Sequence, residues 1–185
     1  MNFLLTATNH HGVHSPFVFD YVTHCLYAKP DYPEKTALNI LLKTIHHFKA
    51  GRIWLPEESL SKERHSEAGH SRKEYLKYGD SDRARVITEK IRKTYPDILL
   101  NESPFDAILT TIARARERLE SASEANEIHN DTFMMIEGMY HSSQSQTDWQ
   151  RLKKNPKVTV TIDLFHCALV FFRKEQAEEH FKIRI

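Results

Sequence analysis

The pattern of apolar and polar positions divides the chain into a helical first part and a second part where strands and helices alternate. Apolar residues recur at three- and four-residue spacing over 17–26, directly after Ser15 and Pro16. That spacing predicts an amphipathic helix, and a serine followed by proline is typical of a helix start. Four further helices are predicted at about 34–48, 81–95, 112–127 and 143–154.

Short runs of strand-forming residues lie between and after these helices. Four strands are predicted, at 52–55, 98–100, 105–111 and 132–136. The last of them is nearly all apolar, as expected for a strand covered on both faces. Two more runs, at 158–162 and 168–172, are separated by a short joint around Phe165 and His166, which predicts an antiparallel hairpin. Residues 181–185 alternate with period two and predict a half-exposed final strand. This order of elements is typical of an α/β fold.

Composition limits the class of protein. With 185 residues, 40% of them hydrophobic, the chain is long enough for one compact unit. We predict an N-terminal helical lead-in over 1–50 and an α/β domain over 51–185. The formal net charge of +1 predicts no nucleic-acid partner, and the lack of a long apolar run predicts no membrane partner. Only two cysteines and no secretory signal predict a cytoplasmic protein.

Glycine is scarce and scattered, with 5 residues in the chain. Nucleotide-binding α/β domains concentrate glycine in one turn that holds the phosphate or cofactor, and this chain has no such turn. The segment after the first predicted strand, about 57–78, is polar with few apolar anchors. It is therefore predicted to be the most mobile part of the fold.

Sequence motifs at the two ends of the chain carry a family resemblance. The first is HGVHSPFVF at 11–19, and the second runs TVTIDLF at 159–165, VFFRK at 170–174 and EHF at 179–181. Together with 135–157, these segments resemble a bacterial group of class I S-adenosylmethionine-dependent methyltransferase-like proteins. They cover roughly a third to a half of the chain, and the end motifs match in order and position.

The resemblance implies a Rossmann-like three-layer sandwich with a mostly parallel sheet of seven strands, the last of them antiparallel. It places the first strand at 53–55, the fourth at 105–110 and the fifth at 132–136. It also implies S-adenosylmethionine as the cofactor, held in working members by a loop of several glycines after the first strand. Here Pro56 and polar residues follow instead, so the cofactor motif is degenerate.

The candidate cofactor-binding residues follow the first and fourth strands. Glu57 and Glu58 could accept hydrogen bonds from the amino group or the ribose of the cofactor. Thr110 and Thr111 stand where the family has an acidic residue and a glycine. These four residues are the positions at which cofactor contact is predicted.

The candidate catalytic residues follow the fifth strand. Glu137 stands where the family carries paired aspartates, and His141 could act as a general base held by Glu137. In open α/β sheets, ligands bind beyond the carboxyl ends of the strands, which favours this position. The alternative is that the two side chains only satisfy a loop and the start of the next helix.

Other reactive residue types have simpler structural explanations. No metal site is predicted, because the spacing of His10, His11 and His14 matches no strong zinc pattern. Cys167 is predicted to be a small buried hydrophobic residue, on the opposite face of its strand from His166. Three arginines of the helix over 112–127 are predicted to lie on a solvated face, at positions 114, 116 and 118.

The sequence thus predicts a methyltransferase-like protein with an eroded cofactor site and weak or no catalysis. Two alternatives stay open: a non-enzymatic interaction or scaffold protein on the same fold, and an active enzyme with an unusual cofactor loop. The substrate, a small molecule or a protein, and the existence of a homo-oligomer also stay open.

Overall fold

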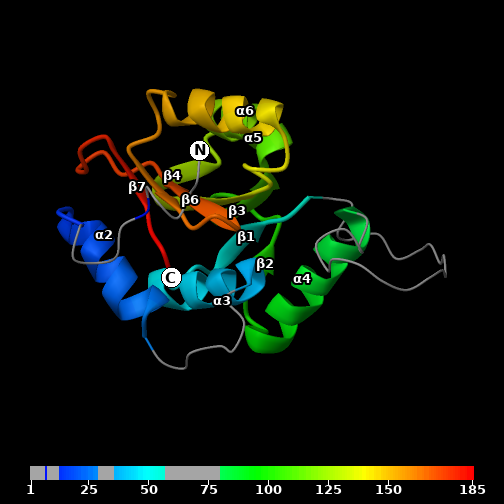
Figure 1. Ribbon diagram of the computed structural model, residues 1–185. Coiled ribbons are helices and arrows are strands. Elements are labelled where there is room, and N and C mark those ends of the chain that lie inside the picture. Colours follow the sequence, from blue (N-terminus) through cyan, green and yellow to red (C-terminus); the bar gives the residue numbers. More distant parts are fainter. Residues whose placement is uncertain (1–6, 8–12, 29–35, 57–79) are drawn as a thin grey trace, which may run out of the picture.

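A seven-stranded sheet lies at the centre of the molecule, between two layers of helices (Figure 1). The computed structural model describes residues 7, 13–28, 36–56 and 80–185, and the side chains from residue 85 onwards in the last range. The strands are β1 (Arg52–Trp54), β2 (Leu99–Leu100), β3 (Phe105–Thr111), β4 (Ile128–Glu137), β5 (Val160–Asp163), β6 (Cys167–Phe171) and β7 (Glu179–Lys182). The helices are α2 (Pro16–Tyr21), the π-helix η2 (Val22–Leu26), α3 (Ala37–Phe48), α4 (Asp80–Thr94), α5 (Ile112–Glu124) and α6 (Ser143–Lys153).

The sheet is mostly parallel and has the strand order β2-β1-β3-β4-β6-β5-β7. Strand β6 alone runs antiparallel to its neighbours, β4 and β5. The β5–β6 pair, in which Val160 lies opposite Phe171, confirms the predicted hairpin. The fold is a Rossmann-like α/β sandwich with helices before the first strand, as predicted from the sequence.

The seven strands are not the seven that the resemblance implies. In the described part of the chain, β2 is the one strand between β1 and β3, where the resemblance implies two. The total is still seven strands because β7 follows the antiparallel strand β6 and pairs in parallel with β5. The antiparallel strand that the resemblance implies is β6, and the alternating residues after 178 add a further parallel strand beyond it at the edge.

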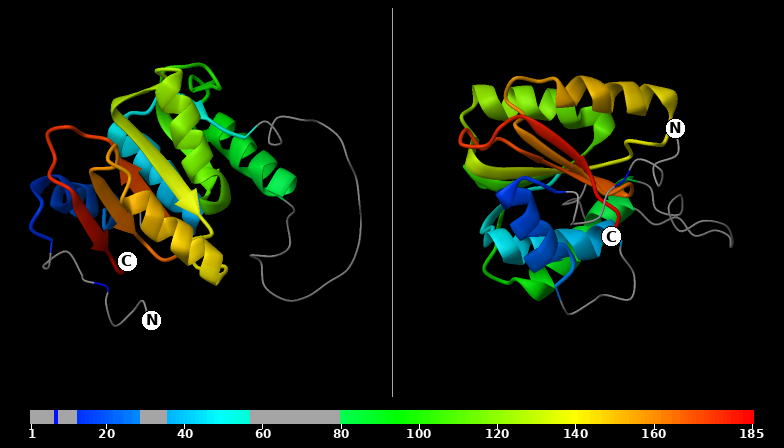
Figure 2. Two further views of the ribbon diagram at one scale, coloured as in Figure 1. Left: turned by 90° about the horizontal axis from the view of Figure 1, so that it is seen from above. Right: turned by 60° about the vertical axis from the view of Figure 1, so that its left-hand side comes forward.

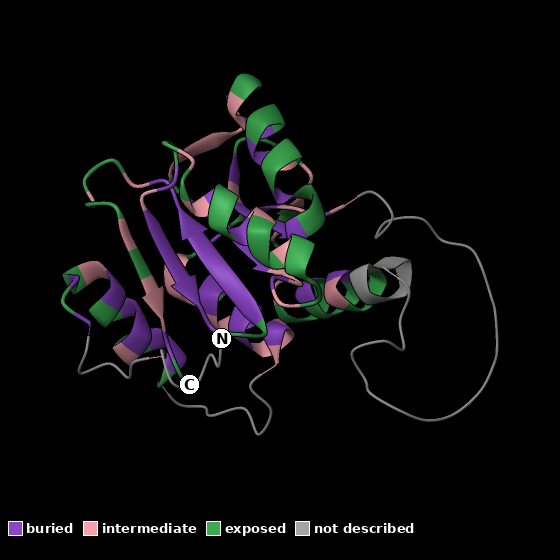
Figure 3. Ribbon diagram, turned by 45° about the horizontal axis from the view of Figure 1, so that its top comes forward, coloured by how far each residue is buried: buried purple, intermediate pink, exposed green. Residues whose placement is uncertain are grey.

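Two hydrophobic cores lie on the two faces of the sheet. Along β4, Phe133 and Met135 pack on the side of α2, α3 and α4, whereas Met134 and Ile136 pack on the side of α5 and α6. This alternation follows from the two-residue period of a strand. The layers are seen edge-on in Figure 2, and Figure 3 shows that the central strands are buried while the outer helix faces are exposed. The apolar run of the fifth predicted strand is thus explained by cover on both faces.

Some predicted boundaries differ from the observed ones. The helix after Pro16 has the expected length but continues from α2 into the π-helix η2, and the side chain of Ser15 makes no capping hydrogen bond. Helix α3 ends at Phe48, as predicted, and its cap residue Lys49 has a φ of 53°, in the left-handed region. Strand β4 begins four residues earlier than predicted, at Ile128, because a register shift between Phe105 and Ala107 lets its first part join β3.

Asp106 joins the amino ends of three strands. Its Oδ2 accepts hydrogen bonds from the backbone N–H groups of Gly51 (2.7 Å) and Arg52 (2.9 Å), just before and in β1. Its Oδ1 lies 3.0 Å from Nε2 of His129 in β4. The N–H of Asp131 donates to His129 Nδ1, so the ring proton is on Nε2 and is donated to Asp106. This network lies at the opposite end of the sheet from the carboxyl edge and has a structural role.

We expect Asp106→Ala to lower the free energy of unfolding by about 1.5 kcal/mol, because two backbone donors lose a charged acceptor that is partly exposed. Urea denaturation followed by circular dichroism measures the change. Asp97→Ala, at an exposed position just before β2, serves as the control and should change stability by less than about 0.5 kcal/mol. Equal stability of the two variants would show that the network contributes nothing.

Candidate functional site

The candidate site lies at the edge of the sheet where the parallel strands have their carboxyl ends. The ends of β1, β3, β4 and β5 meet there, and because β6 is antiparallel its amino end joins them. The crevice outside this edge, where the strand order reverses between β1 and β3, is where open α/β sheets bind ligands. The predicted site residues that the structure describes all lie along this edge.

The end of β1 is tied to the end of β2 by Asn101. The side-chain Oδ1 of Asn101 accepts a hydrogen bond of 2.7 Å from the backbone N–H of Leu55. The backbone N–H of Asn101 donates to Ile53 O at 2.9 Å. The φ of Asn101 is 59°, in the left-handed region that asparagine tolerates. Sequence reasoning missed Asn101. The available signal was an asparagine directly after a short apolar run.

The predicted cofactor-binding residues are only partly placed. Glu57 and Glu58, and with them the segment predicted to be mobile, lie outside the described residues. Thr110 is buried, and by alternation along β3 its side chain is on the α5 side, whereas Thr111 is on the α3 side. Thr111 lies opposite Glu137 of β4. The structure therefore brings Thr111 and Glu137 together and points Thr110 the other way.

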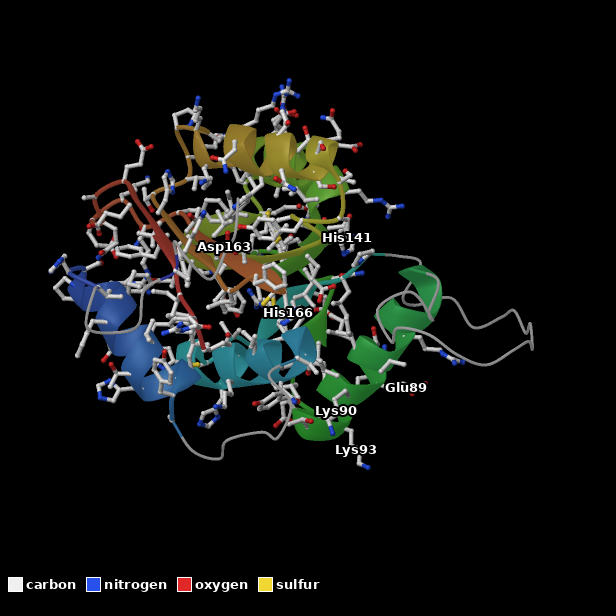
Figure 4. The ribbon with its side chains drawn as sticks, in the orientation of Figure 1. Glu89, Lys90, Lys93, His141, Asp163 and His166 are labelled. Atoms are coloured by element: carbon white, nitrogen blue, oxygen red, sulfur yellow. The ribbon has the colours of Figure 1, made fainter. Side chains whose placement is uncertain are left out.

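The predicted catalytic residues lie on β4 and the turn after it. Glu137 is opposite Cys167 of β6 as well as Thr111 of β3. Gly138 follows with a φ of 83°, and a Cβ at that position would lie 3.2 Å from Nδ1 of His141. The glycine is required both by this conformation and by the close approach of the His141 ring. His141 is exposed, and Figure 4 shows it near the carboxyl edge. Its role as a base held by Glu137 stays a prediction.

A buried carboxylate at the end of β5 holds two aromatic residues, and sequence reasoning did not include this carboxylate in the site. Asp163 is 2% exposed. The phenolic O–H of Tyr140 donates a hydrogen bond to its Oδ2, and the backbone N–H of Phe165 donates to its Oδ1 at 3.0 Å. The rings of Tyr140 and Phe165 stack with centroids 5.4 Å apart and planes 23° apart. The structure thus joins the turn after β4 to the hairpin between β5 and β6.

The surroundings of Asp163 and Tyr140 determine which of the two side chains carries the proton of their hydrogen bond. Burial raises the pKa of Asp163, and the hydrogen bonds from Tyr140 and Phe165 and the charge of Lys182 offset part of that rise. Burial, with the nearby Asp163 carboxylate, also raises the pKa of Tyr140. Tyr140 therefore stays protonated at neutral pH and acts as a hydrogen-bond donor, which excludes it as a general base there.

The hairpin between β5 and β6 turns sharply at Phe165. The N–H of His166 donates to Leu164 O at 2.9 Å, which closes a three-residue γ-turn around Phe165. The φ of Phe165 is 71°, a conformation that is strained for a residue with a side chain. Phe165 is nevertheless 45% exposed, so burial of its ring does not account for the strain.

Four other expectations concern Cys167, the arginines of α5, a metal site and a membrane span. Cys167 is buried, as predicted. His166 is exposed in the turn before β6, so it does not lie in the strand with Cys167. Arg118 departs from the predicted solvated face, because its guanidinium lies 4.3 Å from the Trp54 ring centroid and pairs with Glu127 at 2.8 Å. Within the described ranges, no three His, Cys, Asp or Glu side chains gather so as to hold a metal ion. No helix among the described residues has the length and apolar character needed to span a membrane.

Comparisons with known proteins give one structural likeness. No protein-family model matches the chain, and no curated protein matches it. A solved structure described as "a putative caffeoyl-CoA O-methyltransferase from Staphylococcus aureus" aligns with a TM-score of 0.43 and 10% identity, over 88% of this chain and 95% of that one. A likeness at this level carries no argument about activity, and the fold class rests on the strand order and directions given above.

Proposed function

We propose that this protein is methyltransferase-like with an eroded cofactor site, so that it binds S-adenosylmethionine weakly or not at all and has weak or no catalysis. The observation that carries the proposal is the hydrogen bond from the Leu55 N–H to Asn101 at the end of β1. In the family that the end motifs resemble, the backbone after this strand approaches the cofactor.

The backbone donors at the end of β1 support this proposal. The N–H of Leu55 is already bound to Asn101, and Pro56 has no N–H to donate. The next two residues, Glu57 and Glu58, carry side chains where a close approach of backbone to ligand requires glycine. Among the described residues at the end of β1, neither Leu55 nor Pro56 therefore offers the cofactor a free backbone N–H.

We expect S-adenosylhomocysteine to bind with a dissociation constant of about 1 mM or weaker, equivalent to at most about 4 kcal/mol. Isothermal titration calorimetry is the measurement, because the product of the reaction usually binds such sites well. Glu57→Ala is the matched variant and should weaken this binding further, because Glu57 is one of the positions at which cofactor contact is predicted.

A micromolar dissociation constant that Glu57→Ala abolishes would contradict the proposal. It would mean that the acidic residues after Pro56 replace the glycine loop, and that the chain is an active enzyme with an unusual cofactor loop. A micromolar constant that Glu57→Ala leaves unchanged would contradict it equally, with the cofactor held elsewhere along the edge.

A further inference from the structure

We propose that His47 makes the contact between α3 and the helices before it sensitive to pH, so that α2 and η2 loosen from α3 in mildly acidic solution. We call these two consecutive helices, residues 16–26, the leading helices. They pack beside α3 on one face of the sheet (Figure 2). His47 lies in the last turn of α3, shortly before β1 begins, so the proposal does not depend on the candidate site at the carboxyl edge.

The ring of His47 lies where α2 is held against α3. Its centroid is 5.4 Å from that of Tyr21 in α2, with the planes 73° apart, and 4.8 Å from that of Phe48, with the planes 87° apart. The His47 side chain is only 19% exposed. Tyr21 is fully buried, which raises the pKa of its phenol, and its hydroxyl forms a hydrogen bond of 2.7 Å with Thr44 of α3. A charge on His47 therefore acts directly on the packing of α2 against α3.

Among the described residues, one carboxylate faces His47. Asp20 of α2 has its Oδ2 3.6 Å from Nε2 of His47, and its Oδ1 lies 2.8 Å from Nδ1 of His24. The Asp20 side chain is 58% exposed, so solvent screens its attraction for a charged ring. The other titratable groups that act on the charge of His47 are His24 of η2 and His46 of α3. Because histidines gain a positive charge in mildly acidic solution, one exposed carboxylate then faces three cations.

The contributions to the charge of His47 oppose one another, and burial is the largest. Burial lowers the pKa of His47 from its ordinary 6.5, Asp20 offsets part of the fall, and His24 and His46 add to it. The carboxyl end of α3 also favours a charged ring, by an amount that solvent reduces. Because the folded state holds this proton less tightly than the unfolded chain, the stabilising contribution of His47 is fully present above pH 6.5 and is lost as the pH falls through the lowered value.

Hydrogen–deuterium exchange of the full chain at pH 7.5 and pH 5, corrected for the intrinsic effect of pH on exchange, measures the opening of the leading helices. We expect the amides of residues 19–27 to exchange about threefold faster at pH 5 after this correction. Helix α5, which contains no histidine, is the internal control, and its corrected exchange should not change.

Three variants identify the group responsible. His47→Gln removes the titratable ring and should abolish the pH dependence in residues 19–27. His24→Gln removes a histidine that is 66% exposed and should keep most of the pH dependence. Asp20→Asn removes the carboxylate that favours the charged ring and should make the loosening at pH 5 larger.

Equal corrected exchange of residues 19–27 in the wild type at the two pH values would overturn the proposal. Slower exchange at pH 5 would also overturn it, because the attraction of Asp20 would then outweigh burial, and so would a loosening that persists in His47→Gln. If His47→Gln is already loose at pH 7.5, Asp20→Asn decides: a larger loosening than in the wild type supports the proposal, and a smaller one overturns it. None of these results depends on the binding of S-adenosylhomocysteine, which tests the proposed function.

Discussion

Replacing Phe171 by alanine is expected to lower the free energy of unfolding by about 4 kcal/mol. Phe171 is 1% exposed in β6, and its ring lies near four others. The ring centroids are 5.0 Å from Phe17, 5.5 Å from Phe48, 6.3 Å from Tyr21 and 6.5 Å from Phe133. These rings come from α2, α3 and β4, so the substitution leaves a cavity exactly where the helical lead-in packs on the sheet.

Urea denaturation monitored by both circular dichroism and tryptophan fluorescence measures this change. Phe19→Ala on α2 is the control, because Phe19 is 42% exposed and should cost less than about 0.5 kcal/mol. A loss below about 1 kcal/mol for Phe171→Ala would contradict the expected packing. Two separate transitions in the wild type would contradict the prediction that residues 1–50 and 51–185 form one compact unit.

Asp163→Ala is expected to lower the free energy of unfolding by about 2 to 3 kcal/mol near neutral pH. The substitution leaves the Tyr140 O–H and the Phe165 N–H, both part-buried, without their acceptor. Leaving a donor unsatisfied costs about 1–3 kcal/mol when the donor is buried. Relief of the desolvation penalty on the carboxylate offsets part of that cost. Thermal or urea denaturation of the variant gives the value, and a loss below about 1 kcal/mol would show that the hydrogen bonds contribute little.

The pH dependence of an Asp163→Asn variant tests the titration of the same group. Burial raises the pKa of Asp163 above its ordinary 3.8, so the folded state holds the proton more tightly than the unfolded chain. Its stabilising contribution is fully present below pH 3.8 and is lost as the pH rises through the raised value. The stability of the wild type relative to Asp163→Asn should therefore be greater at pH 4 than at pH 7. A difference of the opposite sign would mean that the folded state favours the charged form of Asp163.

The fold was largely predictable because local patterns determine most of its elements. Strand β3 has the predicted bounds, Phe105–Thr111, since a proline precedes it and a helical pattern begins directly after it. The hairpin followed from two β-rich runs with a short joint. The exception is β7, whose place at the edge depends on pairing with β5, a partner that alternation alone does not reveal.

The site was less predictable because its contacts join residues far apart in the sequence. Tyr140 and Asp163 are 23 positions apart, and Leu55 and Asn101 are 46 apart. Asp163 lies inside a run of strand-forming residues, where its own neighbours do not show which donors face it. Glu137 and Thr111 could be placed on one edge because both end predicted parallel strands, and alternation turns Thr110 to the other face. Which of the two threonines lies on the same face as Glu137 follows only from the observed register.

The two outer strands of the sheet have a consequence for how copies of this protein meet. Strand β2 is two residues long, and β7 at the other edge is four residues long, with Glu179 and Lys182 at its ends. In the described part of the chain, each edge strand therefore offers only a short row of backbone N–H and C=O groups. The row on β7 also has a charged residue at each end. Short and charged edges are poor templates for strand addition. Folded copies of this protein therefore offer one another poor edges for joining their sheets.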